Sequence, residues 1–409
     1  MRTRSLVALT AITIANLVVA GCSSDTNPDA GGSAKSGDSV KVALLGVFSG
    51  QLSSGYPIVQ DVVKAWAKNI NDNGGLDGRP VELIVKDTGG PTGTNVSAAK
   101  EVINEGVAAI LDVDNDVPWV KLADQAGVPV IAQPSIGALV TDGVFPMAAS
   151  PSAAIMLMLE AAKDFGPKFA LGYAAESSVA AQYAAQFDAI AKEVGVSVVV
   201  SSRISASQPD YTAFCQSLKD TGADSVFIGH SAAIAKKVAD QCFQQGVTIP
   251  KIMLGGQTPR DWITDPAYQG SLTTDVVAPF FDDSIPGVAD YRKAMKKYLP
   301  SLEGTADDNS FALQGWALTQ MLEYAVEKGG GATAKDIYAG LYSAKGETLD
   351  GLIAPVTYVE GEKTHGNCGF SWLIKDDDFA LGPHGAESYC VDAETVKKLD
   401  EPLMAALGG

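Results

Sequence analysis

The chain has 409 residues, of which 48 are Asp or Glu and 30 are Lys or Arg, so its formal net charge is −18. This acidity makes nucleic acid and anionic lipid head groups poor partners for its surface. The length is sufficient for two domains of ordinary size.

The amino-terminal segment has the features of an export signal. Two arginines precede a mostly apolar run, residues 6–19, which is too short to span a membrane comfortably. The run ends in the sequence VAGC, which resembles a bacterial lipobox, in which the cysteine, here Cys22, becomes the lipidated amino terminus. We expect a lipoprotein signal peptide at residues 1–21 and a flexible tether at 22–39, with a plain secretory signal as the alternative.

The cysteine count fits this location. A lipid on Cys22 would hold the mature chain to the outer side of the cell membrane, an oxidising compartment. Four cysteines then remain, an even number, which indicates disulfides. The local pairings are Cys215 with Cys242, on consecutive expected helices, and Cys368 with Cys390. The two other connectivities and free buried thiols stay open.

From residue 40 onwards, apolar strands alternate with segments of helical periodicity. The expected strands are VKVALLGVF (40–48), VELIVKD (81–87), VAAILDVD (107–114) and VPVIAQPS (128–135), and the expected helices cover 59–71, 96–105 and 119–126. Strands that alternate with helices in this way predict an α/β fold, with a parallel sheet covered on both faces.

A second set of the same kind begins after residue 152. Its expected strands are FALGYAA (169–175), VSVVVSS (196–202), SVFIGHS (225–231) and KIMLGGQ (251–257), with helices that include 180–194 and 233–245. TTDVVAPFF (273–281) then passes back towards the first set. A long helix is expected over 310–329 because its apolar residues are spaced to cover a sheet. The tail, 356–376, is predicted to form strands.

Three segments carry a resemblance to a known family: VALLGVFSGQLSSGY (42–56), WAKNINDNGGLDGRPVELIVKDTGGPT (66–92) and AGVPVIAQPS (126–135). Across residues 40–375 the chain resembles type I periplasmic solute-binding proteins of the leucine/isoleucine/valine-binding group, the receptors of branched-chain-amino-acid ABC importers. The second segment is the most specific, with an Ile-Asn helix end, a Gly-Gly pair, and a strand that ends in Asp. We expect its NDNGGLDGRP loop to serve the architecture rather than the ligand.

The resemblance implies two doubly wound lobes joined by three crossovers, near 149–152, 278–281 and 351–355. Lobe I would be 40–149 plus 280–350, and lobe II would be 150–279 plus 351–409. A small-molecule ligand would lie between them, at the carboxyl ends of the strands. Closure of the lobes would bury it, and the permease of an ABC importer would bind the closed form. We expect a monomer that is not an enzyme.

The strand-end loops then supply the candidate ligand contacts. These are Ser54, Tyr56, Asp114, Asn115, Asp116, Ser135 and Ile136 in lobe I, and Ser178, His230, Ser231 and Gln257 in lobe II. Family members that bind amino acids place an acid at the end of the MLGGQ-type strand, where it balances the ammonium. Gln257 stands at that place here, and burying an ammonium without its carboxylate costs several kcal/mol. We therefore expect a neutral or weakly cationic solute, aromatic ones included, and not a free branched-chain amino acid.

The acidic run DVDND (112–116) has two interpretations. It is either a solvated strand end or a direct ligand contact, and a contact would disfavour an anionic ligand. An EF-hand is excluded because the Gly and the Glu that such a loop requires are replaced by Val117 and Ala123. Arg260 is the nearby cation that would reverse the preference against anions.

Aromatic residues are few, so their positions are informative. Tyr56, Trp119 and Trp262 fall in or beside the predicted strand-end loops, where each either walls the ligand or packs on its own lobe. Trp316 and Trp372 lie within regular elements and are expected in the core.

A serine hydrolase is the main alternative. SVFIGHSAA places Ser231 between a strand and a helix, as in a nucleophile elbow, and His365 and His384 follow it in the chain. The second Gly of that motif is Ala233, however, and no HGGG-like oxyanion segment precedes it. A sensory ectodomain of the same fold is a further alternative. The sequence contains no Walker A motif, zinc-ligand spacing or G-x-G-x-x-G, so no cofactor or metal is expected.

Overall fold

The structure is a computed structural model. It describes residues 38–49, 53, 56–114, 117–135, 138–139, 141–147, 149–176, 178–256, 258–364 and 366–407, without the side chains of 178–179, 182–183 and 403–407. The predicted signal peptide, the predicted lipidation site Cys22 and most of the predicted tether lie outside these ranges.

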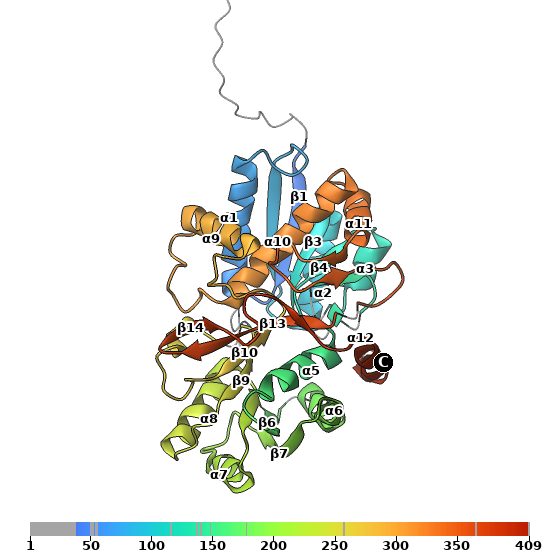
Figure 1. The fold of residues 1–409 in the computed structure, drawn as a ribbon. Coiled ribbons are helices and arrows are strands. Elements are labelled where there is room, and N and C mark those ends of the chain that lie inside the picture. Colours follow the sequence, from blue (N-terminus) through green and yellow to red (C-terminus); the bar gives the residue numbers. More distant parts are fainter. Residues whose placement is uncertain are drawn as a thin grey trace, which may run out of the picture. The chain divides into compact units, whose positions relative to one another are not determined.

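The first sheet is entirely parallel, with the strand order β2-β1-β3-β4-β5. Val42 and Leu44 of β1 belong to the same core as the helices α1 and α10, whereas Ala43 and Leu45 pack with α2 and α3. Helices therefore cover both faces, and Figure 1 shows α1 and α10 beside this sheet. The elements are β1 (Val40–Gly46), α1 (Pro57–Asp72), β2 (Val81–Asp87), α2 (Thr92–Asn104), β3 (Ala109–Val113), α3 (Val120–Gln125), β4 (Val130–Ala132), β5 (Val144–Pro146), α9 (Pro286–Tyr298), α10 (Ser310–Gly329) and α11 (Ala334–Tyr342).

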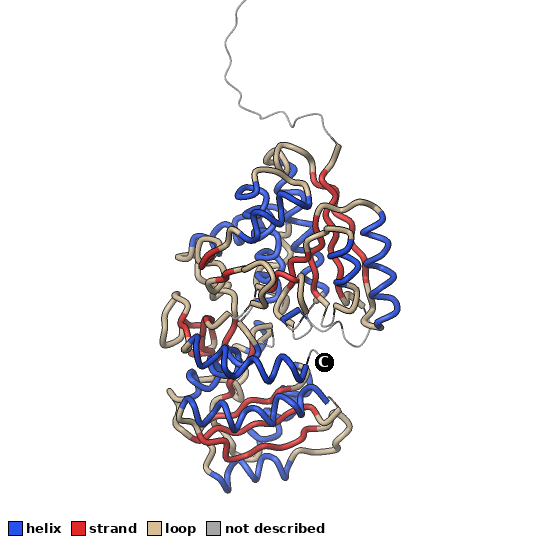
Figure 2. Tube along the Cα trace, turned by 90° about the vertical axis from the view of Figure 1, so that its right-hand side faces the viewer, coloured by secondary structure: helices blue, strands red, loops and turns tan. Residues whose placement is uncertain are grey.

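The second sheet has five parallel strands in the order β7-β6-β8-β9-β10, extended by the antiparallel strands β13 and β14. Phe169 and Leu171 of β6 pack with α5, α6 and α12, and Ala170 lies in the core that contains α7 and α8. Figure 2 shows these strands between two layers of helix. The elements are α5 (Pro151–Ala162), β6 (Lys168–Ala174), α6 (Ser178–Val194), β7 (Ser197–Ile204), α7 (Thr212–Thr221), β8 (Ser225–Gly229), α8 (Ala232–Gln244), β9 (Lys251–Leu254), η1 (Arg260–Trp262), β10 (Leu272–Asp275), β13 (Cys368–Lys375), β14 (Asp378–Leu381), β15 (Tyr389–Cys390) and α12 (Ala393–Leu407).

Two connections between the sheets run antiparallel beside each other. The N–H of Ala278 donates to the carbonyl of Leu352 (2.9 Å), and the N–H of Ala354 donates to the carbonyl of Val276 (2.8 Å). A small two-stranded sheet, β11 (Lys345–Glu347) with β12 (Val356–Thr357), adjoins the second of them. These segments coincide with two of the three expected crossovers, while the lobe boundaries themselves stay a prediction.

The predicted α/β class with doubly wound parallel sheets is confirmed, and α10 has the predicted bounds. The helix α5 was not predicted, because nearly all of its residues are buried and an apolar residue at almost every position gives no periodicity. The expected strand over 356–376 is wrong in extent. Only 356–357 and 368–375 are strands, and the described residues of the polar segment between them form a loop.

The NDNGGLDGRP loop joins α1 to β2. The Asn71 side chain accepts from the Val81 N–H (2.6 Å) and donates to the Val81 carbonyl (2.9 Å), which fixes the start of the strand. Gly75 has a φ of +78°, and a Cβ there would lie 1.9 Å from the carbonyl oxygen of Arg79. Only glycine fits this turn, so the loop has the architectural role that its sequence predicts.

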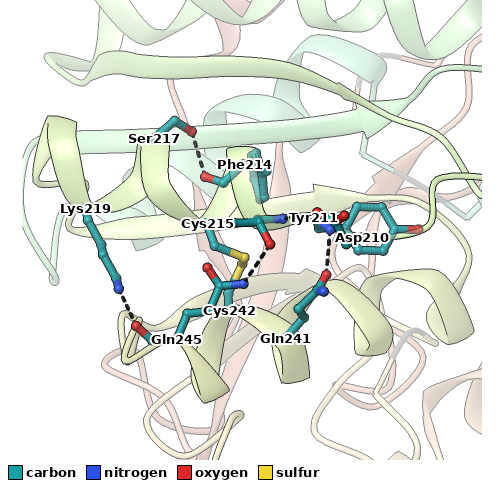
Figure 3. The surroundings of a disulfide bond; sticks show 10 residues. Asp210, Tyr211, Phe214, Cys215, Ser217, Lys219, Gln241, Cys242 and Gln245 are labelled. Carbon is teal, nitrogen blue, oxygen red and sulfur yellow. Dashed lines mark hydrogen bonds between the residues drawn. A yellow bond between two sulfur atoms is a disulfide. The ribbon is translucent and has the colours of Figure 1, made fainter.

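Both local disulfides are confirmed. Cys215 of α7 is bonded to Cys242 of α8, as Figure 3 shows, and Cys368 of β13 is bonded to Cys390 of β15. Among the described residues, no helix has the length and apolar composition needed to cross a membrane. Within the same ranges, no three His, Cys, Asp or Glu side chains are grouped so that they could hold a metal ion.

Candidate functional site

Strand ends from both sheets border one cavity of about 490 Å³. The first sheet contributes the residues that follow β1 and β4, and the second contributes the ends of β9 and β10. The amino-terminal halves of α5 and α10 complete the walls. The carboxyl ends of parallel strands are where open α/β sheets bind ligands, so this cavity is the candidate site.

Tyr56 forms the wall nearest to α1, and its predicted contact with a ligand stays a prediction. It precedes Pro57, the first residue of α1, and its ring centroid lies 5.2 Å from that of Phe311 on α10. Burial raises the pKa of the Tyr56 phenol, which is hydrogen-bonded to Gln133, and the nearby carboxylates of Asp114 and Asp112 raise it further. Tyr56 therefore presents a neutral aromatic surface at physiological pH.

Asp112 and Asp114 are both buried at the end of β3. The Asp114 carboxylate accepts from the Thr88 hydroxyl (2.7 Å), and the Asp114 N–H donates to Asp112 (3.3 Å). The interpretation of these two residues as a solvated strand end is therefore wrong. They place negative charge close to the Tyr56 side of the cavity. Asn115 and Asp116 lie outside the described residues, so their predicted ligand contacts stay predictions.

Ser135, also a predicted contact, lines the cavity after β4. Its Oγ accepts from the Ala138 N–H (3.1 Å), so the hydroxyl proton is available to another acceptor. Gln133 is buried and donates to the Val113 carbonyl (3.2 Å), which ties the ends of β3 and β4 together. Ser54 and Ile136 lie outside the described residues.

Asp275, the last residue of β10, is the cavity residue that the sequence reasoning missed. Its carboxylate accepts from the Val276 N–H (2.7 Å) and from the Gln314 side chain (3.2 Å), and Ser310 also hydrogen-bonds to it. Burial outweighs these bonds and raises the pKa of Asp275 to about 6. A sequence signal does exist, since Asp275 is the one acid in the run TTDVVAPFF.

The Gly-Gly pair after β9 allows α10 to approach this carboxylate. A Cβ on Gly255 would lie 1.5 Å from Asp275 Oδ2. Gly256, with a φ of +79°, donates its N–H to the Ser310 Oγ (2.6 Å), and a Cβ there would meet the Phe311 ring at 2.3 Å. The two glycines thus bring the end of β9, Asp275 and the first turn of α10 into contact. Gln257, the predicted contact that follows them, lies outside the described residues.

Arg260, the nearby cation, is held by other groups. Its Nε lies 3.4 Å from an oxygen of the buried Asp308. Its guanidinium lies 5.5 Å from the ring centroid of Phe379 and 5.9 Å from that of Phe280. Arg260 therefore balances Asp308, and it does not reverse the expectation against an anionic ligand.

His230 and Ser231 lie in a second cluster, at the ends of β6, β7 and β8. The His230 Nδ1 accepts from the Ser231 N–H (2.8 Å), and its Nε2 lies 3.5 Å from Glu176. Glu176 accepts from the Ser205 hydroxyl (2.6 Å), which is the main cause that lowers the pKa of Glu176 to about 2. The carboxylate therefore ties these loops together, and ligand binding by His230 and Ser231 stays a prediction. Ser178 begins α6, but its side chain lies outside the described part.

The geometry gives little support to the hydrolase alternative. The ring of His384 stacks on that of Tyr389, with centroids 4.0 Å apart, beside the Cys368–Cys390 disulfide. His365 lies outside the described residues. The imidazole that contacts Ser231 is its neighbour His230, whose Nδ1 accepts from the Ser231 N–H (2.8 Å) and lies 3.4 Å from the Ser231 Oγ.

The tryptophans divide as follows. Trp316 and Trp372 are buried in the core, as predicted. Trp119 is fully buried against the first sheet, and Trp262 is buried against Tyr268, with centroids 4.6 Å apart. Of the three aromatics beside strand ends, Tyr56 is therefore the one that walls the cavity.

Comparison with known proteins agrees with this architecture. A family model described as periplasmic binding protein matches residues 39–371. No curated protein matches the chain. A leucine binding protein, LivK, from Thermotoga maritima has 17% identity and a TM-score of 0.65, over 84% of this chain and 99% of that one.

Two other solved structures show the same fold with different ligand names. A solute binding protein of an ABC transporter from R. palustris, in complex with benzoate, has 18% identity and a TM-score of 0.66, over 87% of this chain and 99% of that one. A fatty acid ABC transporter substrate-binding protein from Thermomonospora curvata has 17% identity and a TM-score of 0.67, over 89% of this chain and 95% of that one.

Proposed function

Because the chain belongs to the periplasmic binding protein family, we propose that it is the extracytoplasmic receptor of an ABC importer. It captures a small solute between two lobes and delivers it to the permease. The observation that carries this proposal is the cavity of about 490 Å³ bordered by strand ends of both sheets. A volume of this size is typical of small-molecule sites.

The proposed lobes are 40–149 plus 280–350 and 150–279 plus 351–409. Contacts between them support a closing motion at this cavity, because Ser310 and Gln314 of α10 hydrogen-bond to Gly256 and Asp275 at the ends of β9 and β10. These bonds cross from one proposed lobe to the other beside the paired crossovers. They would hold the closed form that the permease recognises.

The ligand class has to come from the site, since the named neighbours share the fold and differ in ligand. Asp275 supplies the cavity with the carboxylate that Gln257 lacks. An ammonium therefore has a partner here. The carboxylate of an amino acid has no cationic partner among the described lining residues, which include no Lys, Arg or His. We therefore keep the proposal of a neutral or weakly cationic solute.

A thermal-shift screen of the mature protein tests the proposed function. We expect one class among amines, amides, polyols, aromatic acids and amino acids to raise the melting temperature. A ligand at one hundred times its Kd adds about 2.7 kcal/mol of stability. Leucine, isoleucine and valine should give no comparable shift. Calorimetric binding of leucine at micromolar concentration would contradict the ligand class, and a screen with no stabilising solute would contradict the receptor function.

The lipid anchor is a separate proposal, supported by VAGC at the end of the apolar run. Cys22→Ser should leave the protein unprocessed or unanchored, because serine lacks the thiol that receives the lipid. Membrane fractionation and the mass of the amino-terminal peptide measure this. Ser23→Ala, which keeps the cysteine, is the matched control and should stay in the membrane fraction. The proposal fails if the Cys22→Ser protein is cleaved and partitions like the wild type.

A further inference from the structure

We propose that Asp275 is the counter-ion for a solute that carries a protonated nitrogen. This inference rests on the proposed receptor function and narrows its ligand to organic cations, such as primary or secondary ammonium and guanidinium compounds. It places the charged end of the solute at the end of β10 and the rest of the solute towards α1 and α5.

The charge of the cavity lining supports this inference. Asp275 is the one side chain with a formal charge among the described residues that line the cavity. The other polar side chains there, Tyr56, Ser135, Thr274 and Gln314, are neutral. The buried Asp112 and Asp114 add negative charge close to the Tyr56 wall. Opposite charges attract and like charges repel across such a low-dielectric space, so the cavity favours cations over anions.

The partners of Asp275 leave its charge unbalanced. Gly255 after β9, Ser310 and Gln314 on α10, and Gly369 on β13 surround the residue, and none of them titrates. No Lys, Arg or His forms an ion pair with it within the described ranges. The phenol of Tyr56 is the titratable group on the opposite wall. A carboxylate taken from water without a cation is costly, and a bound cation removes that cost.

The carboxylate is also oriented for a ligand. Oδ1 accepts from Val276, Val277 and Gln314, whereas the Gln314 contact of Oδ2 is longer, at 3.4 Å. Oδ2 packs against Gly255, where a Cβ would lie 1.5 Å from it. Ser310 Oγ accepts from Gly256 and is therefore free to donate its own proton to Asp275. This network fixes the carboxylate and leaves acceptor capacity for an N–H of the solute.

The apolar surfaces of the cavity define the remainder of the solute. Leu139, Leu157 and Leu254 line it together with the rings of Tyr56 and Phe311. Aromatic faces attract cations as well as apolar groups. A compact amine with an aliphatic or aromatic body fits this lining, and a polyol or a dicarboxylate does not.

The test uses matched sets of probes on the mature, oxidised protein at pH 7.5. One set is benzylamine, benzyl alcohol and benzoate, and a second is isoamylamine, isoamyl alcohol and isovalerate. Within each set only the head group changes, so thermal shifts followed by calorimetry isolate the effect of charge. We expect the amine of at least one set to bind most tightly.

The matched variants are Asp275→Asn and Asp290→Asn. Asparagine keeps the shape of Asp275 and removes its charge, so the affinity for the best amine should fall about 10- to 100-fold. Asp290 is exposed on α9, away from the residues that line the cavity. Asp290→Asn removes the same formal charge from the protein, so this variant should bind the amine with the affinity of the wild type. Two results would overturn this inference but not the proposed receptor function. One is a carboxylate probe that binds as tightly as the amine of its set, and the other is an amine affinity that is unchanged in Asp275→Asn. If neither these probes nor the wider screen yields a bound solute, both the inference and the proposed function are overturned.

Discussion

Replacing both Cys215 and Cys242 by alanine should lower the free energy of unfolding by about 3 kcal/mol. The disulfide joins residues 27 positions apart, and closing a loop of that length restricts the unfolded chain by about this amount in the chain-entropy model. Both cysteines are buried between α7 and α8 (Figure 3), so the variant also loses packing. Urea unfolding of the oxidised mature protein, followed by circular dichroism, measures the loss.

The second disulfide provides the comparison. Cys368 and Cys390 lie 22 positions apart, so loop closure alone predicts almost the same loss for their double alanine variant. Cys390 is exposed, however, and the bond ties the short strand β15 to β13. If the Cys215/Cys242 variant loses more unfolding free energy than the Cys368/Cys390 variant, the difference therefore measures the packing of the buried pair between α7 and α8. A loss below about 1 kcal/mol for that pair would contradict its role in holding the two helices together.

Local patterns were sufficient to predict much of the fold. The long helix 310–329 was predicted with its observed bounds because its apolar stripe has helical spacing. In the structure, Gly330 ends it in the left-handed conformation. The parallel strands of both sheets, except β5 and β10, were recognised as apolar runs between helices. The helix α9 was not predicted, although it begins with Pro286 and its buried residues Val288, Tyr291 and Met295 have helical spacing, because these few apolar residues stand among charged ones.

The site was predicted less completely, because it depends on which strands are neighbours. The rule that ligands bind at strand ends led to Tyr56 and Ser135, which both line the cavity. The same rule was not applied to 273–281, because that run was interpreted as a crossover and not as a strand that ends at Asp275. The missing acid was sought at Gln257 and, from the opposite lobe, at Asp114 or Asp116. In the structure, β10 pairs in parallel with β9, so the acid comes from the adjacent strand.

Asp275→Asn should raise the free energy of unfolding of the ligand-free protein by about 2 kcal/mol at pH 8. The usual pKa of this carboxyl, 3.8, rises to about 6 in the fold, so the folded state binds the proton more tightly than the unfolded state. The stability of the wild type therefore falls as the pH rises from about 4 to about 6, and stays lower above that range. Each pKa unit corresponds to about 1.4 kcal/mol, and solvent in the cavity reduces the full difference.

The comparison is made by urea unfolding of the wild type and Asp275→Asn at pH 4 and pH 8. The gain should be large at pH 8 and small at pH 4, where the wild-type carboxyl is protonated in the folded state and about two-fifths protonated in the unfolded state. Asp290→Asn should change stability little at either pH, because that side chain is exposed. If Asp275→Asn instead loses stability at pH 8, the bonds to Ser310 and Gln314 outweigh the burial of charge, and Asp275 is a structural tether between β10 and α10. A variant that is more stable at pH 8 yet binds an amine less tightly would show that the carboxylate is kept for its ligand at the expense of the fold.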